Sequence, residues 1–271
     1  KYNQADYSAT LMHDEALEFI DDNKDSKFFL YYASPLPHLP LQAPKDWVDY
    51  YRKKIGPEKP YTGRRYYPNQ YPKATYAAMI TYLDEQVGEI VKKLKQIGKY
   101  ENTLIIFTSD NGPTHKKEVD TNFFKSAGNL NGERNRLKGS VHEAGIRVPF
   151  IASWPKSIEK GSKSNHISAF QDFFPTVCDI LEIDAPYPID GISYLPTFQG
   201  RDQKKHEYLY WEISGYGGQQ AIRQGNWKGL KKNLQKGKQK LELYNLEKDI
   251  LEKNDVSKDN ADIVQKFEKL L

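Results

Sequence analysis

The stretch ENTLIIFTSDNG, residues 101–112, decides the fold that we expect for this chain. Its centre, residues 104–108, is a continuous apolar and largely β-branched run of strand length, and turn-forming residues lie on both sides. A strand that is apolar on both faces is typical of a sheet with helices on each side. We therefore predict an α/β fold built around this strand.

Two oxygen donors, Asp110 and Asn111, follow this strand directly. Ligands of open α/β sheets bind just beyond the carboxyl ends of the strands, and hard cations prefer carboxylate and amide oxygens. The two residues are therefore candidate metal ligands. The alternative is an Asx turn that only closes the strand, with Gly112 at a positive φ, and the Asp-Asn-Gly sequence taken alone favours that alternative.

A second apolar run, residues 28–33, also ends in a polar element. Three prolines within residues 35–40 hold the following loop extended, and this loop presents His38. A helical segment follows this run in the sequence and leads into residues 104–108. This is the order of a βαβ unit, which predicts two parallel strands in one sheet. His38 would then lie at the same edge as Asp110. A surface imidazole without a role is the alternative.

Apolar residues recur at helical spacing in several further segments. The strongest pattern covers residues 73–98 and ends at Gly98, a residue type that commonly follows the last turn of a helix. Other patterns predict helices within residues 8–23, 47–52, 170–182 and 259–271.

The character of the chain changes near residue 200, after a turn-rich segment. Four short strand-like runs follow and predict a small antiparallel sheet, at residues 208–211, 220–223, 227–230 and 241–244. We therefore expect two parts, a larger α/β part over residues 1–200 and a small α+β subdomain over residues 201–271.

The composition excludes several classes of protein. Forty basic and thirty-six acidic residues give a net charge of +4, which is not the footprint of a nucleic-acid-binding protein. The single Cys178 excludes an intrachain disulfide framework and a multi-cysteine metal site. No apolar run approaches the ~18 residues that a membrane span needs. The first residues show no export signal.

The loop over residues 114–139 is polar, rich in Gly and Asn, and carries several cationic side chains. His115, Arg134 and Arg136 are candidate contacts for an anionic substrate, because loops that follow a ligand-bearing strand often carry binding residues. A solvated side chain is the alternative for each of them. Lys138 closes the same loop.

Three motifs in sequence order resemble one family, the type I (formylglycine-dependent) sulfatases and arylsulfatases of the alkaline-phosphatase-like superfamily. They are PHLP at residues 37–40, TSDNG at 108–112 and KGSVHEAGIRVP at 138–149. The tail, with QAIRQGNWK at residues 220–228 and ELYNLEKD at 242–249, resembles the small C-terminal sheet of that family. Each motif alone is a weak signal, but four in the right order with fitting spacers are a strong one.

The resemblance implies roles for the candidate residues. Asp110 and Asn111 would be two oxygen ligands of a Ca²⁺ that screens the sulfate oxygens. His38 would bind the sulfate or help to protonate the leaving group, and Lys138 would pair with the sulfate and the leaving oxygen. The substrate would be a sulfated glycan or an aryl sulfate, and the location periplasmic or extracellular. Residues 1–200 would be the C-terminal part of the family's catalytic α/β domain.

The chain also departs from the family pattern. Sulfatases of this type oxidise a Cys or Ser in a C/S-x-P-x-R motif to formylglycine, and neither Cys178 nor Ser153 begins such a motif. The family's first strand, whose Asp pair completes the calcium site, has no counterpart in the chain, and Ca²⁺ takes about six to eight oxygens. We therefore expect the C-terminal portion of a longer sulfatase, with an incomplete calcium site, no turnover by itself and an uncovered sheet edge that promotes self-association.

Two other functions stay open. A phosphate or phosphonate ester hydrolase of the same superfamily is one, although its two-zinc members need more Asp and His ligands than these motifs supply. The other is a non-catalytic fragment that binds acidic glycans through the basic loops and the Tyr-rich surface. Nineteen tyrosines fit such a surface and ordinary half-buried positions equally well.

Overall fold

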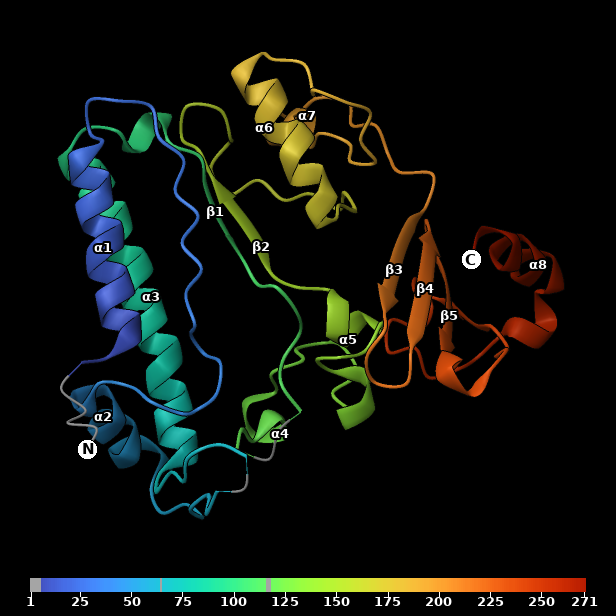
Figure 1. Ribbon diagram of the computed structural model, residues 1–271, viewed down its shortest axis with the longest axis horizontal. Coiled ribbons are helices and arrows are strands. Elements are labelled where there is room, and N and C mark those ends of the chain that lie inside the picture. The colour runs from blue at the N-terminus through green and yellow to red at the C-terminus, as the bar shows by residue number, and fades with distance from the viewer. Residues whose placement is uncertain (1–5, 64, 116–117) are drawn as a thin grey trace. The chain divides into compact units, whose positions relative to one another are not determined.

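The computed structural model describes residues 6–63, 65–115 and 118–271 of the chain (Figure 1). These residues form two compact units. Unit 1 holds the described residues up to Leu104 and residues 118–120, and unit 2 holds residues 105–115 and 121–271. The subdomain boundary expected near residue 200 falls inside unit 2 and stays a prediction.

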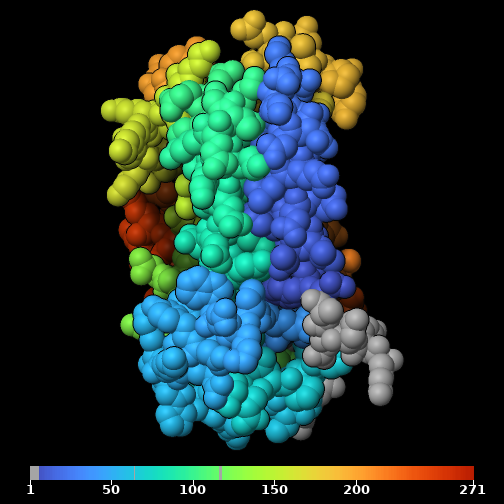
Figure 2. Space-filling model, turned by 90° about the vertical axis from the view of Figure 1, so that its left-hand side faces the viewer, coloured from blue at the N-terminus to red at the C-terminus, as the bar shows by residue number. Residues whose placement is uncertain are grey.

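Unit 1 is helical. It contains α1 (Ser8–Asp22), α2 (Lys45–Ile55), α3 (Pro72–Gln96) and the short 3₁₀ helix η1 (Tyr100–Asn102). Helices α1 and α3 lie side by side in Figures 1 and 2 and contact one another. The three predicted helices are thus confirmed, and α3 stops two residues before Gly98, which takes a φ of 69° as expected of a residue after the last turn.

The prediction of a strand over residues 28–33 is wrong. The segment is extended, but it belongs to no sheet of the described residues. Phe28 contacts Phe19 of α1 with ring centroids 5.8 Å apart, whereas Phe29 and Tyr31 are 65% and 81% exposed. An apolar run is compatible with packing on helices alone, because hydrophobicity does not reveal whether a backbone partner is present.

Unit 2 begins with a two-stranded sheet. Strand β1 (Ile105–Thr108) pairs with β2 (Phe150–Ser153), so that Ile105 is opposite Ser153. The pairing is antiparallel, and the predicted parallel pairing of β1 with residues 28–33 is therefore corrected. The described residues of the connection between the strands include the short helices α4 (Thr121–Phe124), η2 (Arg134–Arg136) and α5 (Glu143–Ile146).

The next part of unit 2 has η3 (Phe170–Asp172), α6 (Phe173–Leu181) and α7 (Leu195–Phe198). Asp172 is fully buried and accepts hydrogen bonds from the backbone N–H of Ile192 and from His206 Nε2, each at 2.8 Å. This carboxylate therefore ties α6 to the chain that leads into the small sheet. Cys178 on α6 is buried and unpaired by any disulfide.

The small sheet is antiparallel throughout, as predicted, in the order β3 (Leu209–Ile213), β4 (Gln219–Gln224), β5 (Trp227–Lys232) and β6 (Glu242–Asn245). The short helices η4 (Leu234–Lys236) and η5 (Ser257–Asp259) flank β6, and α8 (Ala261–Leu270) follows. Phe267 of α8 is fully buried against Ile222 and Leu243 on one face. The opposite face packs against Val141, which precedes α5.

No helix within the described ranges combines the length and the apolar character that crossing a membrane requires.

Gln86 gives a test of how unit 1 is held together. Its side chain is fully buried, donates to the carbonyl oxygen of Ala9 at 2.9 Å and accepts from the hydroxyl of Tyr32 at 3.2 Å. Gln86→Leu should lower the free energy of unfolding by about 1–2 kcal/mol, because both bonds are lost in a buried place. Urea unfolding checks this against Gln96→Leu at the exposed end of α3. Equal losses of stability in the two variants would show that the hydrogen bonds of Gln86 do not stabilise unit 1.

Candidate functional site

The loop that follows β1 is fixed to the segment around α5 by backbone hydrogen bonds. Gly112 N–H donates to the carbonyl of Gly145 at 2.9 Å, and Lys138 N–H donates to the carbonyl of Pro113 at 3.0 Å. A Cβ on Gly112 would lie 1.9 Å from the carbonyl oxygen of Ala144, so glycine is needed for this close approach. Gly112 is not among the positive-φ residues, so the positive φ that the Asx-turn alternative assigns to it is wrong.

Asp110 and Asn111 lie at the start of this fixed loop. Asp110 is exposed, and Asn111 donates its Nδ2 to the carbonyl of Gly112 at 2.9 Å, which makes its Oδ1 the atom available to a cation. This donor pair suits the chemistry of Ca²⁺, but two residues are far fewer than the six to eight oxygens that the ion takes. Within the described part of the chain, no group of three or more His, Cys, Asp or Glu side chains could hold a metal.

Lys138 and His115 meet at the other end of the loop. His115 Nδ1 lies 3.2 Å from the carbonyl oxygen of Lys138, and since that oxygen only accepts, the ring nitrogen donates. Hydrogen bonds therefore join the segment that carries Asp110 and His115 to the segment that carries Lys138. His115 and Lys138 are 23 residues apart in the sequence, and no local sequence pattern predicted the hydrogen bond between them.

His38 belongs to unit 1. It is exposed, its Nδ1 lies 2.8 Å from the carbonyl oxygen of Leu39, and its ring contacts Tyr66 edge-on with centroids 6.4 Å apart. The local bond and the aromatic contact orient the imidazole within its proline-rich loop.

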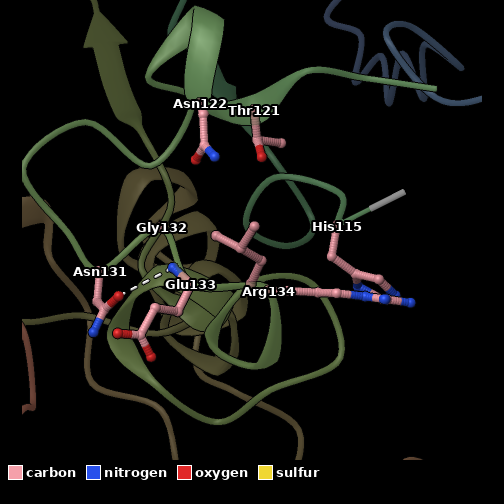
Figure 3. Close-up of a pocket in the computed structure, with 8 residues that line it drawn as sticks. His115, Thr121, Asn122, Asn131, Gly132, Glu133 and Arg134 are labelled. Atoms are coloured by element: carbon pink, nitrogen blue, oxygen red, sulfur yellow. Dashed lines mark hydrogen bonds between the residues drawn. The ribbon is translucent and has the colours of Figure 1, made fainter. Parts of the chain in front are cut away.

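A polar pocket of about 430 Å³ opens beside His115 (Figure 3). Its lining is His115, Thr121, Asn122, Asn131, Gly132, Glu133, Arg134 and Leu137. Hydroxyl, amide, carboxylate and guanidinium groups together suit a ligand with many hydroxyls and a negative charge. His115 and Arg134, two of the predicted substrate contacts, both line this pocket.

Arg136 does not line the pocket. Its side chain is only 13% exposed, and Nη1 donates to the carbonyl of Glu252 at 2.6 Å, while Nε lies 3.5 Å from a carboxylate oxygen of Glu133. This guanidinium is therefore already engaged in joining the loop to residues near Glu252.

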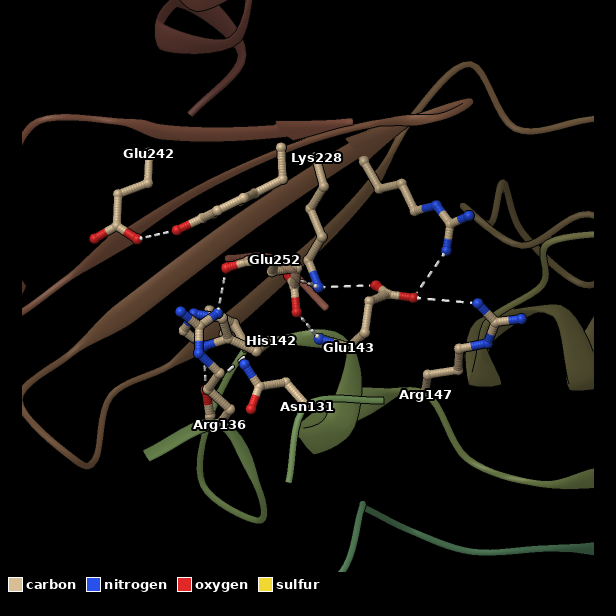
Figure 4. Close-up of polar contacts among 12 residues, drawn as sticks. Asn131, Arg136, His142, Glu143, Arg147, Lys228, Glu242 and Glu252 are labelled. Carbon is tan, nitrogen blue, oxygen red and sulfur yellow. Dashed lines mark hydrogen bonds and ion pairs between the residues drawn. The ribbon is translucent and has the colours of Figure 1, made fainter. Parts of the chain in front are cut away.

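A buried ion network lies beneath this segment (Figure 4). Lys228 of β5 has no exposed side-chain surface, and its ammonium lies 2.8 Å from Glu143 and 3.1 Å from Glu252. The second oxygen of Glu143 lies 3.3 Å from Arg223 and 3.6 Å from Arg147. Glu252 also accepts the backbone N–H of Glu143 at 2.7 Å. The network thus fastens α5 to the small sheet.

The two buried carboxylates respond differently to the network. Burial by itself raises the pKa of Glu143, but the charges of Lys228 and Arg223 outweigh it and leave that pKa below its usual value. Burial also raises the pKa of Glu252, and in this case the attraction of Lys228 is not sufficient to bring it down. Of the two carboxylates, Glu143 is therefore the one whose negative charge the network stabilises more strongly.

His142, next to Glu143, is fully buried and neutral. Burial, and then the positive charges of Arg136, Lys232 and Lys228, lower the pKa of His142 to about 2. Its Nδ1 lies 2.6 Å from the hydroxyl of Ser140, and its Nε2 has no hydrogen-bond partner among the described residues.

Sequence reasoning did not single out Glu143, Lys228 or Glu252. Glu143 and Lys228 lie inside motifs that carried the family resemblance, which is the signal that could have drawn attention to them. Their pairing spans 85 residues, and no local pattern reports a contact of that kind.

Two family profiles match the chain. The sulfatase profile covers residues 1–183, and the profile "N-sulphoglucosamine sulphohydrolase, C-terminal" covers residues 136–271. The first matches more than half of the chain, and the second includes the small sheet.

Individual relatives of the chain are named as sulfatases too. An uncharacterised sulfatase, YdeN of Escherichia coli K12, is 32% identical over 77% of this chain and 34% of its own length. An N-acetylgalactosamine-6-O-sulfatase of Bacteroides thetaiotaomicron is 27% identical over 97% of this chain and 50% of its own length. The crystal structure of Ps i-CgsB in complex with k-i-k-neocarrahexaose superposes with a TM-score of 0.78 at 30% identity, over 100% of this chain and 56% of that one. The chain therefore spans about a third to a half of the length of these proteins.

The buried network predicts a large effect of Lys228→Met. The variant leaves two buried carboxylates without their shared ammonium, which should lower the free energy of unfolding by about 3–5 kcal/mol. The matched control is Lys232→Met on the same strand, whose pair with Glu242 is 30% exposed on each side and should cost about 1 kcal/mol or less. Urea unfolding of both variants provides the comparison. A loss no larger for Lys228→Met than for the control would disprove the network's role.

His142 predicts a pH dependence of stability. Its folded pKa is below the unfolded value near 6.5, so the unfolded state binds the extra proton and stability falls as pH drops below about 6.5. Replacement by Gln removes this titration. The stability of the wild type relative to His142→Gln should fall by about 1.4 kcal/mol per pH unit between roughly pH 6 and pH 4. Urea unfolding at several pH values measures the difference, and parallel pH profiles would contradict a neutral buried His142.

Proposed function

The chain belongs to the sulfatase family, and we propose that it supplies one part of an active site that hydrolyses sulfate esters of a carbohydrate. The observation that carries this proposal is the set of hydrogen bonds that joins the segment of Asp110 and His115 to Lys138, together with the polar pocket that His115 lines. The B. thetaiotaomicron relative is named for a sulfated amino sugar, and Ps i-CgsB was crystallised with an oligosaccharide. Both favour a sulfated glycan over a simple aryl sulfate.

Lys138 has the central role in the proposed reaction. Its ammonium pairs with the sulfate group and with the oxygen that departs, where negative charge grows as the S–O bond breaks. His38 binds the sulfate or gives a proton to the departing oxygen, which makes the alcohol a better leaving group. Each of these two side chains thus acts on charge that is greatest in the transition state.

Asp110 and Asn111 are the proposed ligands that this chain offers to Ca²⁺. When bound, the ion would neutralise charge on the sulfate oxygens. The remaining oxygen ligands and the formylglycine nucleophile are proposed to lie outside these 271 residues, since the C/S-x-P-x-R motif is not in this sequence. The chain by itself is therefore expected to have no turnover.

His115 and Arg134 are proposed to hold the sugar itself. They line the same pocket (Figure 3), where the Arg134 guanidinium would donate to a carboxylate or a second sulfate on the sugar. Arg136 keeps its position beneath the loop and supports it. We also propose a location outside the cytoplasm, in the periplasm or beyond the cell, on the basis of the family resemblance.

The test is the rate of sulfate release from sulfated oligosaccharides and from a chromogenic aryl sulfate, by the full encoded protein with Ca²⁺. Lys138→Ala in that protein should lower kcat/KM about a hundredfold or more, since one charge-stabilising donor is lost. Lys156→Ala, at an exposed lysine after β2, is the matched control and should leave the rate unchanged.

Two comparisons distinguish a sulfatase from the two alternative functions, an ester hydrolase for phosphate or phosphonate and a non-catalytic glycan-binding protein. Phosphate and phosphonate monoesters of the same alcohol should be hydrolysed more slowly than the sulfate ester, and the reverse order would identify the other hydrolase class. Glycan binding without sulfate release by the full protein would instead favour the non-catalytic function.

A further inference from the structure

The turn between β3 and β4, residues 214–218, brings an aromatic side chain to the proposed substrate site. Tyr216 at its centre is 64% exposed. Its sequence, Ser-Gly-Tyr-Gly-Gly, surrounds the ring with glycines. The tyrosine is the only large side chain that this turn carries.

Tyr216 lies against two residues of the site. A Cβ built on Gly139 would be 2.5–2.9 Å from three atoms at the hydroxyl end of the Tyr216 ring, so that end of the ring rests on the Gly139 backbone. The ring also meets His115 edge-on, with centroids 6.4 Å apart and an angle of 86°. The tyrosine therefore borders both the residue next to Lys138 and a residue of the polar pocket.

Hydrogen bonds on both sides hold the turn in this place. Gln219, the first residue of β4, donates its Nε2 to the carbonyl of Gly139 at 2.8 Å and accepts the N–H of Val141 at 3.3 Å. On the other side, Gln235 N–H donates to the carbonyl of Gly217 at 3.0 Å. The ring is consequently presented from a fixed support.

The backbone of Tyr216 is in an unfavourable conformation. Its φ is 53°, in the left-handed region that glycine adopts freely and that an aromatic residue rarely occupies. A glycine or asparagine would suit the backbone better and would not expose a ring to water. Strain of this kind persists where the surrounding structure enforces it, and it is concentrated at functional sites.

Support of the Lys138 loop is the competing explanation for the ring. A ring that served only to cover Gly139 would be buried by that contact, yet nearly two thirds of Tyr216 stays open. The open surface is therefore available to a ligand with an apolar face that can lie close to the sulfate-binding residues.

We propose that Tyr216 forms a stacking subsite for a sugar ring of the glycan, next to the ring that carries the scissile sulfate. One face of a pyranose ring presents mainly C–H groups, which pack well on an aromatic ring, while the tyrosine hydroxyl remains near water and sugar hydroxyls. The inference rests on the proposed function and adds to it that the substrate is an oligosaccharide or polymer of at least two sugars.

The test uses the full encoded protein and two substrates, N-acetylgalactosamine 6-sulfate and a tetrasaccharide of chondroitin 6-sulfate, with carrageenan oligosaccharides as a second series. Tyr216→Asn removes the ring and keeps a residue that tolerates a positive φ, so its melting temperature should equal or exceed that of the wild type. Its KM for the oligosaccharide should rise roughly five- to tenfold, with kcat and the KM for the monosaccharide unchanged.

Two further variants serve as controls. Tyr216→Phe keeps the stacking surface and should retain the KM of the wild type. Tyr187→Asn, at a tyrosine that is 63% exposed elsewhere in unit 2, should change neither constant.

The outcomes are distinguishable. An equal loss of kcat on both substrates in Tyr216→Asn, or a marked fall in its melting temperature, would make Tyr216 a support of the Lys138 loop and overturn the subsite. An unchanged KM for the oligosaccharide would overturn it as well. If the wild-type protein releases sulfate from none of these substrates, the proposed function itself is lost, and the subsite with it.

Discussion

A single buried ammonium, that of Lys228, is the constraint on which the site segment of unit 2 depends. Two buried carboxylates reach it from different parts of the chain, Glu143 on α5 and Glu252 after β6. A buried ion pair adds little net stability over an apolar core of the same shape, but the loss of one member leaves the others buried without compensation. The three residues therefore specify one arrangement of α5 on the small sheet.

The position of the candidate site follows from that arrangement. Once α5 is fixed, the carbonyl of Gly145 holds the turn after Asp110 and Asn111, and the segment before α5 holds Lys138 against Pro113. The small sheet contributes a second contact through Gln219, which binds the backbone on both sides of Ser140. The small sheet carries none of the proposed catalytic residues, and yet it determines where several of them lie.

The sequence predicted these elements unequally, for physical reasons. The helix that ends before Gly98 and the four strands of the small sheet were predictable, because their periodicity and turns are local. The prediction of a strand at residues 28–33 was wrong, because whether an apolar run pairs in a sheet depends on a partner strand that its own residues do not define. Asp110 and Lys138 were predicted through motifs and His115 through the polar loop that carries it, whereas Tyr216 lies in a glycine-rich turn that has the pattern of a simple connection. The pairing of Glu143 with Lys228 is a long-range contact, which one sequence does not reveal.

The most direct test of this account is hydrogen exchange, measured by mass spectrometry, on the wild-type chain and on Lys228→Met under native conditions. The account predicts that the amides of residues 110–115 and 138–146 lose protection in the variant, while α1 and α3 of unit 1 keep theirs. Unchanged protection around Gly112 and Lys138, or a uniform loss over the whole chain, would show that the buried ammonium does not hold the site in place.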